Sequence, residues 1–285
     1  MSTPPRGLQP GGRYQDWMPT QVRYVASDLD GTIIHPDHRV TPAVQRAVRE
    51  VADSGVPVGF ATGRLRFGAT AVYEQLGSPG PHIFHNGAEV RADGRTVRSW
   101  PLSPSEIADV FAISVDRNAY GEFYTEDGYY YMQYRPGAEF HWKILGWEPL
   151  GAVNDPSQVP GDVLKFTFIG FTKEETTDLE TAFTERDLEV GSAGAGGVSW
   201  SFVNVTKSGV HKGTALVAAA EYLGTNPTSV LAIGDGDNDL PMLAKAGTAV
   251  AMGHASDHVK RNAHLVAPSV LDDGLATALR SLILE

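Results

Sequence analysis

Two aspartates separated by one residue are the first side chains in this sequence able to do chemistry. Asp28 and Asp30 lie in Asp28–Thr32 (DLDGT), directly after the apolar run Val22–Ser27. Two carboxylates this close repel each other and raise each other's pKa, so the pair requires a compensating partner. A divalent cation such as Mg²⁺ commonly takes one or two protein carboxylates together with phosphate oxygens. An ordinary polar turn is the alternative on these five residues alone.

A second acidic cluster follows another apolar run far along the chain. Ser229–Gly234 has the composition of a buried strand, and Asp235, Asp237 and Asp239 come directly after it (GDGDND). In an open parallel sheet, ligands bind at the carboxyl ends of the strands. We therefore expect the two acidic turns to meet at one edge of the sheet.

Two further segments carry groups that can hold an anion. Ala61–Arg64 (ATGR) ends a short apolar run, and a hydroxyl with free N–H groups at the start of a helix suits a phosphate. Lys212 opens a helix, where a positive charge opposes the helix dipole, and a nearby anion would be a reason to place it there. An ordinary capped turn and an incidental surface lysine are the respective alternatives.

Strand and helix patterns alternate at both ends of the chain. Val22–Ser27 is followed by a helical stretch, Ala43–Ser54, and by a second apolar run; Lys212–Leu223 and Ser229–Gly234 repeat the pattern late in the sequence. This spacing is typical of a parallel sheet with right-handed crossovers. We predict an α/β fold: a Rossmann-like parallel-sheet core with helices on both faces.

The middle of the chain has a different pattern, in which a helix with a strand hairpin occurs twice. Ser103 caps a helix over Pro104–Asn118, with a hairpin turn at Glu126–Gly128; a second helix over Lys173–Arg186 precedes two more strands. Repeated helix-plus-hairpin units predict an inserted α+β domain. Residues 135–161 receive no assignment.

These patterns divide the chain into three parts. We expect residues 1–20, which are polar and rich in Gly and Pro, to form a flexible lead. Residues 21–88 and 207–285 would form the core, and residues 89–206 an α+β cap domain. The glycine-rich segment Gly191–Gly197 is predicted to be a flexible hairpin loop.

Composition excludes several classes of partner and chemistry. The chain has 23 Lys and Arg against 34 Asp and Glu, so a formal net charge of −11 argues against nucleic-acid and anionic-membrane partners. It has no cysteine, which rules out disulfides, thiolate metal sites and a cysteine nucleophile. No signal peptide or membrane span is evident, so we expect a cytoplasmic protein. The sequence does not set the oligomeric state, and a monomer and a homodimer both stay open.

Taken in order, DLDGT, ATGR, the helix-opening lysine and GDGDND resemble the motifs of the haloacid dehalogenase-like (HAD) phosphatase superfamily, and its Cof-type branch in particular. Phe84–Ala88 (FHNGA) resembles the asparagine-glycine segment before the cap of that branch, and Leu240–Leu243 also matches. The resemblance implies a Mg²⁺-dependent phosphatase that hydrolyses a small phosphorylated metabolite, such as a sugar phosphate, through an aspartyl-phosphate intermediate.

The resemblance also implies residue roles. Asp28 would be the nucleophile, and Asp30 the general acid and then the base. Asp28 and Asp235 would supply metal-binding carboxylates, and Asp30 its backbone carbonyl. Asp239 would orient Lys212 or metal-bound water from behind. The groups that would hold the phosphate or substrate are the backbone of Leu29, Thr62, Gly63, Lys212 and Asn238.

Two other functions remain open at this point. A phosphomutase of the same superfamily would share DxDGT, and a non-catalytic protein could keep the fold to bind a sugar phosphate. For Arg64, we favour an ion pair with a carboxylate over contact with substrate.

Overall fold

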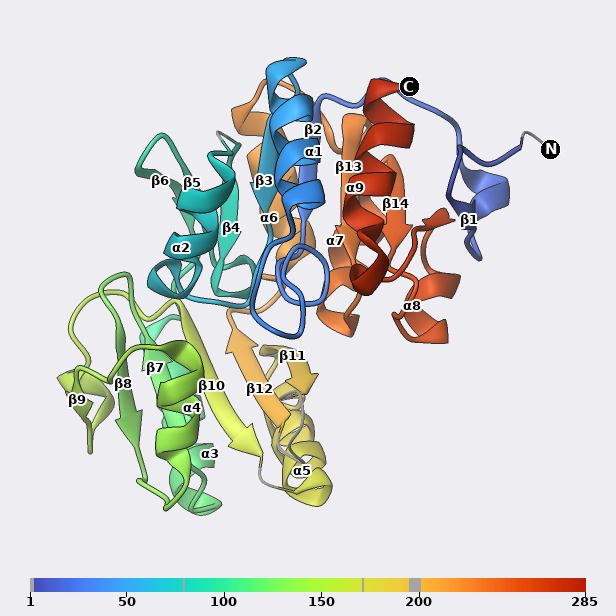
Figure 1. The fold of residues 1–285 in the computed structure, drawn as a ribbon. Helices are drawn as coiled ribbons and strands as arrows, with labels where there is room; N and C mark the ends of the chain where they lie inside the picture. Colours follow the sequence, from blue (N-terminus) through green and yellow to red (C-terminus); the bar gives the residue numbers. More distant parts are fainter. Residues whose placement is uncertain (1–2, 79, 171, 195–200) are drawn as a thin grey trace.

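The computed structural model describes residues 3–78, 80–170, 172–194 and 201–285. The chain forms two layered bodies, with the core in the upper half of Figure 1 and the cap below it. Both chain ends belong to the core, and the green and yellow middle of the chain forms the cap.

The centre of the core is a sheet of parallel strands, which confirms the predicted fold class. Its order is β15-β14-β13-β2-β3, with β1 added outside β15. β2 and β13 are direct neighbours, and Ser27 pairs with Ile233 at their carboxyl ends. The segments that follow these two strands therefore leave the same edge of the sheet side by side. The parallel strands are β2 (Tyr24–Ser27), β3 (Val58–Phe60), β13 (Val230–Gly234), β14 (Thr248–Ala251) and β15 (Leu265–Val266).

Helices cover both faces of this sheet because successive strand residues point to opposite sides. Val25 and Leu231 belong to the apolar cluster under α1 and α9, whereas Ala26 and Ala232 belong to the cluster under α6 and α7. The core helices are α1 (Pro42–Asp53), α2 (Arg66–Leu76), α6 (Lys212–Tyr222), α7 (Leu240–Lys245), α8 (Asp257–Arg261) and α9 (Gly274–Leu279).

The boundary expected at residue 89 needs correction. β5 (Glu89–Ala92) and β6 (Arg95–Ser99) form an antiparallel sheet with β4 (His82–Phe84), which is joined to the core sheet by the bridge between Ala61 and Ile83. Val90 packs in the same cluster as the core strands. The chain therefore crosses into the cap after β6.

The cap is a six-stranded sheet with α3 and α5 on one face and α4 on part of the other. The strand order is β11-β12-β10-β7-β8-β9, antiparallel except for β8 and β9. Ser103 and Glu106 form the expected capping box at the start of α3. The strands are β7 (Gly121–Tyr124), β8 (Tyr129–Met132), β9 (Gly151–Ala152), β10 (Lys165–Gly170), β11 (Glu189–Gly194) and β12 (Ser201–Thr206), and the helices are α3 (Pro104–Asp116), α4 (Ala138–Leu145) and α5 (Lys173–Thr184).

The two faces of the cap sheet differ in chemistry. Phe123, Phe166 and Phe168 lie in one apolar cluster with residues of α3 and α5. The opposite face carries buried polar side chains, including Glu122 and Thr167. α4 covers part of this face, where His141 contacts Glu122, and Lys165 on the same face reaches the Gly63 carbonyl of the core. A sheet face that is both buried and polar is unusual.

The glycine-rich segment expected to be a loop is partly strand. β11 continues through Gly194 and pairs with β12 up to Ser201. The remainder of the expected loop lies outside the described residues.

The structure differs from the flexible lead expected for residues 1–20. β1 (Gln9–Pro10) pairs antiparallel with β15, and a short 3-10 helix follows at Tyr14–Asp16. Trp17 Nε1 donates a hydrogen bond to Thr248 Oγ1 at 3.1 Å. An edge strand such as β15 exposes unpaired backbone groups, and the N-terminal segment satisfies them.

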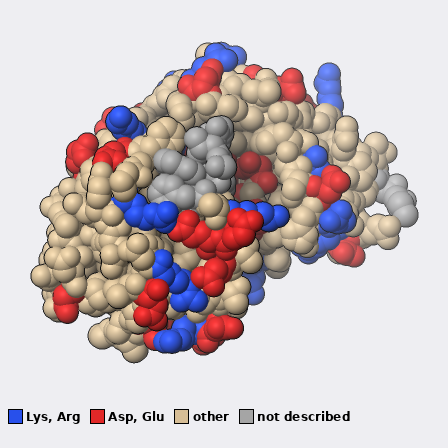
Figure 2. Space-filling view, turned by 90° about the horizontal axis from the view of Figure 1, so that it is seen from below, with Lys and Arg blue, Asp and Glu red and all other residues tan. Residues whose placement is uncertain are grey.

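Within the described part of the chain, no helix combines the length and apolar character that crossing a membrane requires. On the face shown in Figure 2, basic and acidic side chains are interspersed rather than gathered into a basic surface.

Candidate active site

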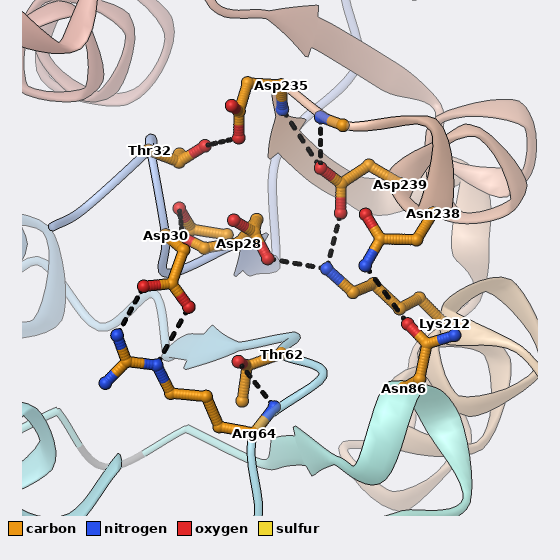
Figure 3. A network of polar contacts seen from close by, with 12 residues as sticks. Asp28, Asp30, Thr32, Thr62, Arg64, Asn86, Lys212, Asp235, Asn238 and Asp239 are labelled. Atoms are coloured by element: carbon orange, nitrogen blue, oxygen red, sulfur yellow. Dashed lines mark hydrogen bonds and ion pairs between the residues drawn. The ribbon is translucent and has the colours of Figure 1, made fainter. Parts of the chain in front are cut away.

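The acidic turns after β2 and β13 lie side by side at the carboxyl edge of the core sheet (Figure 3). One carboxylate oxygen from each of Asp28, Asp235 and Asp239 lies within 4.8 Å of the others. The structure thus brings together the two aspartates that the family resemblance implied as metal ligands, and adds Asp239 to the group.

Close packing between the turns explains the glycine of DLDGT. Gly31 has a φ of +83°, and a Cβ there would lie 2.5 Å from Asp235 Oδ2. Thr32 Oγ1 donates a hydrogen bond to Asp235 Oδ1 at 3.2 Å. The first turn therefore fixes the carboxylate of the second, and a larger residue at position 31 would force them apart.

Lys212 is fully buried and links two of the aspartates. Its Nζ donates to Asp28 Oδ1 at 2.5 Å and to Asp239 Oδ1 at 2.6 Å. Burial by itself lowers the pKa of Lys212, but Asp239 and Asp28 outweigh it and raise that pKa above its ordinary value. Lys212 is therefore a fixed positive charge beside Asp28, not an incidental surface lysine.

Asp239 holds both Lys212 and the turn after β13 in place. Its Oδ2 accepts hydrogen bonds from the backbone N–H groups of Asp235 and Gly236, both at 3.0 Å. Since its Oδ1 binds Lys212, both oxygens are occupied by groups that Asp239 orients. This geometry favours a positioning role for Asp239.

Burial and neighbouring carboxylates disfavour the negatively charged form of Asp28. Burial raises its pKa well above the ordinary value; Lys212 opposes the shift, whereas Asp239, Asp235 and Asp30 add to it. One ammonium among three buried or half-buried carboxylates leaves net negative charge. Another cation would relieve this repulsion.

Asp30 lies apart from that group. Arg64 Nε donates to Asp30 Oδ2 at 2.8 Å, and Arg64 Nη2 contacts Oδ1, so the pair is bidentate. The preference for an ion pair at Arg64 is confirmed. Since the Asp30 side chain is turned to Arg64, its backbone carbonyl remains as the expected contact with a metal.

The segment after β3 lies at the same sheet edge, because Ala61 N donates to Ser27 O at 2.9 Å. Thr62 is buried, and its Oγ1 accepts from Arg64 N at 3.1 Å. A Cβ on Gly63 would meet open space. The Thr62 hydroxyl and the Gly63 backbone therefore lie at the same edge of the sheet as the turn that carries Asp28.

Leu29 can contribute only its backbone. Its side chain is fully buried, and its carbonyl accepts hydrogen bonds from the N–H groups of Ile33 at 2.9 Å and Ile34 at 2.7 Å. The turn that follows β2 is thereby held in one conformation.

Asn86 was given no role from the sequence. Asn238 Nδ2 donates to Asn86 Oδ1 at 3.2 Å, which ties the turn after β13 to the turn after β4. Asn86 is buried and has a φ of +59°, and Gly87 follows with a φ of +111°. The pair Asn-Gly was the available signal, because both residues tolerate the left-handed region.

His254 contacts the aspartate cluster through Asp235. Its Nδ1 accepts from the N–H of Val270 at 3.3 Å, so Nε2 carries the proton of the neutral ring and donates to Asp235 Oδ2 at 3.3 Å. The histidine therefore orients Asp235.

The donor set fits a hard divalent cation. Asp28 and Asp235 present carboxylate oxygens close together, and such oxygens are the ligands that Mg²⁺ prefers. The described part of the site holds no thiol or imidazole cluster of the kind that zinc selects.

Comparison with known proteins identifies the family. The haloacid dehalogenase-like hydrolase family matches residues 25–279. Phosphoglycolate phosphatase of Methanopyrus kandleri is 31% identical over 261 residues, covering 92% of this chain and 97% of that protein. The 5-amino-6-(5-phospho-D-ribitylamino)uracil phosphatase YitU of Bacillus subtilis is 26% identical, covering 92% of this chain and 98% of that protein.

Solved structures show the same fold. A haloacid dehalogenase-like hydrolase from B. subtilis superposes with a TM-score of 0.81 at 23% identity, covering 92% of this chain and all of the other. A HAD phosphatase from Bacteroides thetaiotaomicron gives a TM-score of 0.80 at 24% identity, covering 92% of this chain and 95% of that chain. The chain belongs to the haloacid dehalogenase-like hydrolase family, which confirms the family and the enzyme class expected from the sequence.

Proposed function

We propose that this protein is a Mg²⁺-dependent phosphatase that hydrolyses a small phosphorylated metabolite through a phosphorylated Asp28. The observation that carries this proposal is the buried ion pair between Lys212 Nζ and Asp28 Oδ1, which lie 2.5 Å apart, with the Asp235 carboxylate close by. A nucleophilic carboxylate must approach a dianionic phosphate, and fixed positive charge is needed to offset their repulsion.

In the first step, a carboxylate oxygen of Asp28 attacks the phosphorus atom and the bond from phosphorus to the ester oxygen breaks. The electron pair leaves with the ester oxygen, which takes a proton from Asp30. Lys212 stays beside Asp28 and offsets charge on the transferring group. The products of this step are a free alcohol and a phosphoryl group on Asp28.

In the second step, Asp30 removes a proton from water, and the water oxygen attacks the same phosphorus atom. The bond between phosphorus and the Asp28 oxygen breaks, which releases inorganic phosphate and restores the carboxylate. Arg64 contacts both carboxylate oxygens of Asp30 in the structure, which suits the ionised form that removes the proton from water. In the first step Asp30 would carry a proton on one oxygen and keep Arg64 on the other.

The other residues of the site bind and orient the phosphate. Thr62 and Gly63 would hold its oxygens from one side, and Asn238, fixed by Asn86, from the other. Asp28 and Asp235, with the Asp30 carbonyl, would hold Mg²⁺, which supplies charge stabilisation for the phosphoryl oxygens when bound.

The names of the relatives support a small phosphorylated substrate. Relatives act on phosphoglycolate and on a phosphorylated ribitylaminouracil according to their names, and others are called HMP-PP phosphatases. These differ in the group attached to phosphate, so the common element is a phosphorylated small molecule.

Removal of metal tests the proposal. We expect the protein to release phosphate from p-nitrophenyl phosphate with Mg²⁺, to lose this activity in EDTA and to regain it when excess Mg²⁺ is added. Phosphate release is followed colorimetrically. Full activity after exhaustive chelation would contradict the metal-dependent mechanism, and recovery of an isomerised sugar phosphate without free phosphate would indicate a mutase.

A further inference from the structure

Lys165 is a buried lysine that the mechanism above does not use. It begins β10 of the cap and is 4% exposed. Its Nζ donates to the backbone carbonyl of Gly63 in the core at 2.8 Å and to Asn204 Oδ1 in the cap at 3.1 Å. It also lies 4.3 Å from the centre of the Tyr124 ring. The cap thus places an ammonium group directly against the segment proposed to hold phosphate.

The electrostatic setting of Lys165 is the opposite of that of Lys212. Lys212 contacts two carboxylates, whereas Lys165 contacts a carbonyl, an amide oxygen and a ring, and no carboxylate of the described residues lies within ion-pair distance. A buried charge without a counter-ion is costly. Burial accordingly lowers the pKa of Lys165 to about 7, with Glu122 opposing the shift only in part.

The nearest carboxylate of the cap is already satisfied. Glu122 accepts hydrogen bonds from the hydroxyls of Tyr120 and Tyr124, both at 2.6 Å, and contacts His141 Nδ1 at 2.9 Å. Glu122 therefore has its own donors and does not turn to Lys165.

Other basic groups near Lys165 also have unused hydrogen-bonding capacity. Arg66 Nε and His85 Nδ1 are buried, and neither has a partner among the described residues. Burial and, to a smaller extent, the charges of Lys165 and Arg66 lower the pKa of His85 to about 3, so both cations lie close enough to act on this ring. Two cationic side chains, Lys165 and Arg66, therefore lie close to the neutral ring of His85, and Arg66 Nε has no hydrogen-bond partner among the described residues.

We propose that Lys165 contacts the leaving group of the substrate and selects phosphomonoesters that carry a second anionic group, a carboxylate or a second phosphate. This inference rests on the proposed function, because the first phosphate must occupy the site at Asp28. The second anion would provide the counter-charge that the chain itself does not give Lys165. A charge-assisted hydrogen bond of this kind contributes roughly a tenfold to hundredfold gain in affinity.

Non-hydrolysable phosphonates test the inference without relying on turnover. Phosphonoacetate carries a carboxylate, methylenediphosphonate carries a second phosphonate, and ethylphosphonate carries neither. Binding of each to the full chain with excess Mg²⁺ is measured by isothermal titration calorimetry. We expect at least one of the two probes with an anionic tail to bind ten times or more tightly than ethylphosphonate, and the probe that does so distinguishes carboxylate from phosphate.

Lys165→Met is the decisive variant. Methionine preserves the length of the side chain, and Asn204 keeps its other donor, Thr167 Oγ1 at 3.0 Å, so the cap sheet should fold. We expect this variant to lose the preference, Lys165→Arg to keep most of it, and Lys173→Met, which removes an exposed lysine of the cap, to keep all of it. Thermal unfolding by circular dichroism checks the fold of each variant.

The possible outcomes separate the two claims. If wild-type protein shows no preference, or if Lys165→Met weakens all three probes equally and so keeps the ratio, Lys165 is a structural contact to Gly63 and the inference is wrong. If the preference depends on Lys165 but no phosphomonoester is hydrolysed, the inference holds for binding and the proposed catalytic function fails.

Discussion

At the scale of single residues, buried lysines in this protein occupy two different environments. Lys212 is neutralised by Asp28 and Asp239, and Lys165 has no carboxylate partner among the described residues. The first arrangement keeps the proposed nucleophile, Asp28, and a cation in fixed contact. The second arrangement is the one that we propose an anionic group of the substrate completes.

Asp30→Asn tests the proposed two-step chemistry. Asparagine cannot take a proton from water, so we expect phosphate release to fall about 10²- to 10⁴-fold. With an aryl phosphate, whose leaving group needs little protonation, the first step should continue and phosphorylated Asp28 should accumulate. Intact-mass spectrometry after acid quenching would detect one added phosphoryl group. If this variant released phosphate as fast as the wild type, the role of Asp30 would be contradicted. The same holds if the variant were inactive and carried no phosphoryl group.

Part of the site was predictable at this scale. Asp28 and Asp235 each follow an apolar strand, and parallel strands end at one edge, so their meeting follows from the order of residues. The roles of Asn86 and Lys165 depend on contacts between segments far apart in sequence. Asn86 contacts Asn238, and Lys165 contacts Gly63. No local pattern carries that information.

At the scale of elements, the strands and capped helices were predictable where the signal is local. The Ser103–Glu106 capping box and the hairpin between β7 and β8 are examples. The sequence did not show that β5 and β6 extend the core through β4, or that β1 covers the edge of β15. Both depend on pairing with a distant strand, for which short polar segments give no periodic signal.

The buried side chain of His82, which joins β4 to β3, predicts that the free energy of unfolding depends on pH. His82 Nδ1 accepts a hydrogen bond from Phe60 N at 3.2 Å, and burial lowers the pKa of His82 to about 4. Between pH 6.5 and about 4 the unfolded chain binds a proton at this residue that the folded chain does not, so stability falls as pH falls through that range. From pH 7 to pH 5 the contribution of His82 is about 2 kcal/mol.

Urea unfolding at the two pH values measures this effect. His82→Gln keeps a hydrogen-bond acceptor but does not titrate, so its free energy of unfolding should fall by about 2 kcal/mol less than that of the wild type between pH 7 and pH 5. The same substitution at the exposed His258 should leave the wild-type dependence in place. An identical pH dependence in His82→Gln and wild type would show that His82 does not contribute.

At the scale of the whole molecule, the cap lies with its polar sheet face against the active edge of the core. β11 approaches the turn after β13, and a Cβ on Gly191 would lie 2.8 Å from Asn86 Nδ2 and 3.8 Å from Asn238 Cβ. A glycine of the cap therefore packs against Asn238, which is proposed to hold phosphate, and against Asn86, which fixes it. The sequence predicted an inserted domain, but the close approach depends on how the two bodies meet.

Gly191→Val tests whether this approach matters for catalysis. The added methyl groups would press on Asn86, which is held by Asn238, and keep the cap from settling on the core. We expect kcat/KM to fall about tenfold, since small misplacements of bound groups reduce rate steeply. The same change at Gly151, where a Cβ would meet only Tyr130 at 3.9 Å, should leave kcat/KM within twofold. Equal effects of the two variants would remove the argument for close cap contact.

The central claim is that Asp28, paired with Lys212 and beside Asp235, is the residue that receives the phosphoryl group. The most direct measurement is phosphate release from p-nitrophenyl phosphate with Mg²⁺ by Asp28→Asn, with Asp53→Asn, an exposed aspartate at the end of α1, as the matched control. We predict that Asp28→Asn releases no phosphate above background while keeping a cooperative thermal transition, and that Asp53→Asn matches the wild type. Undiminished phosphate release by folded Asp28→Asn would contradict the account.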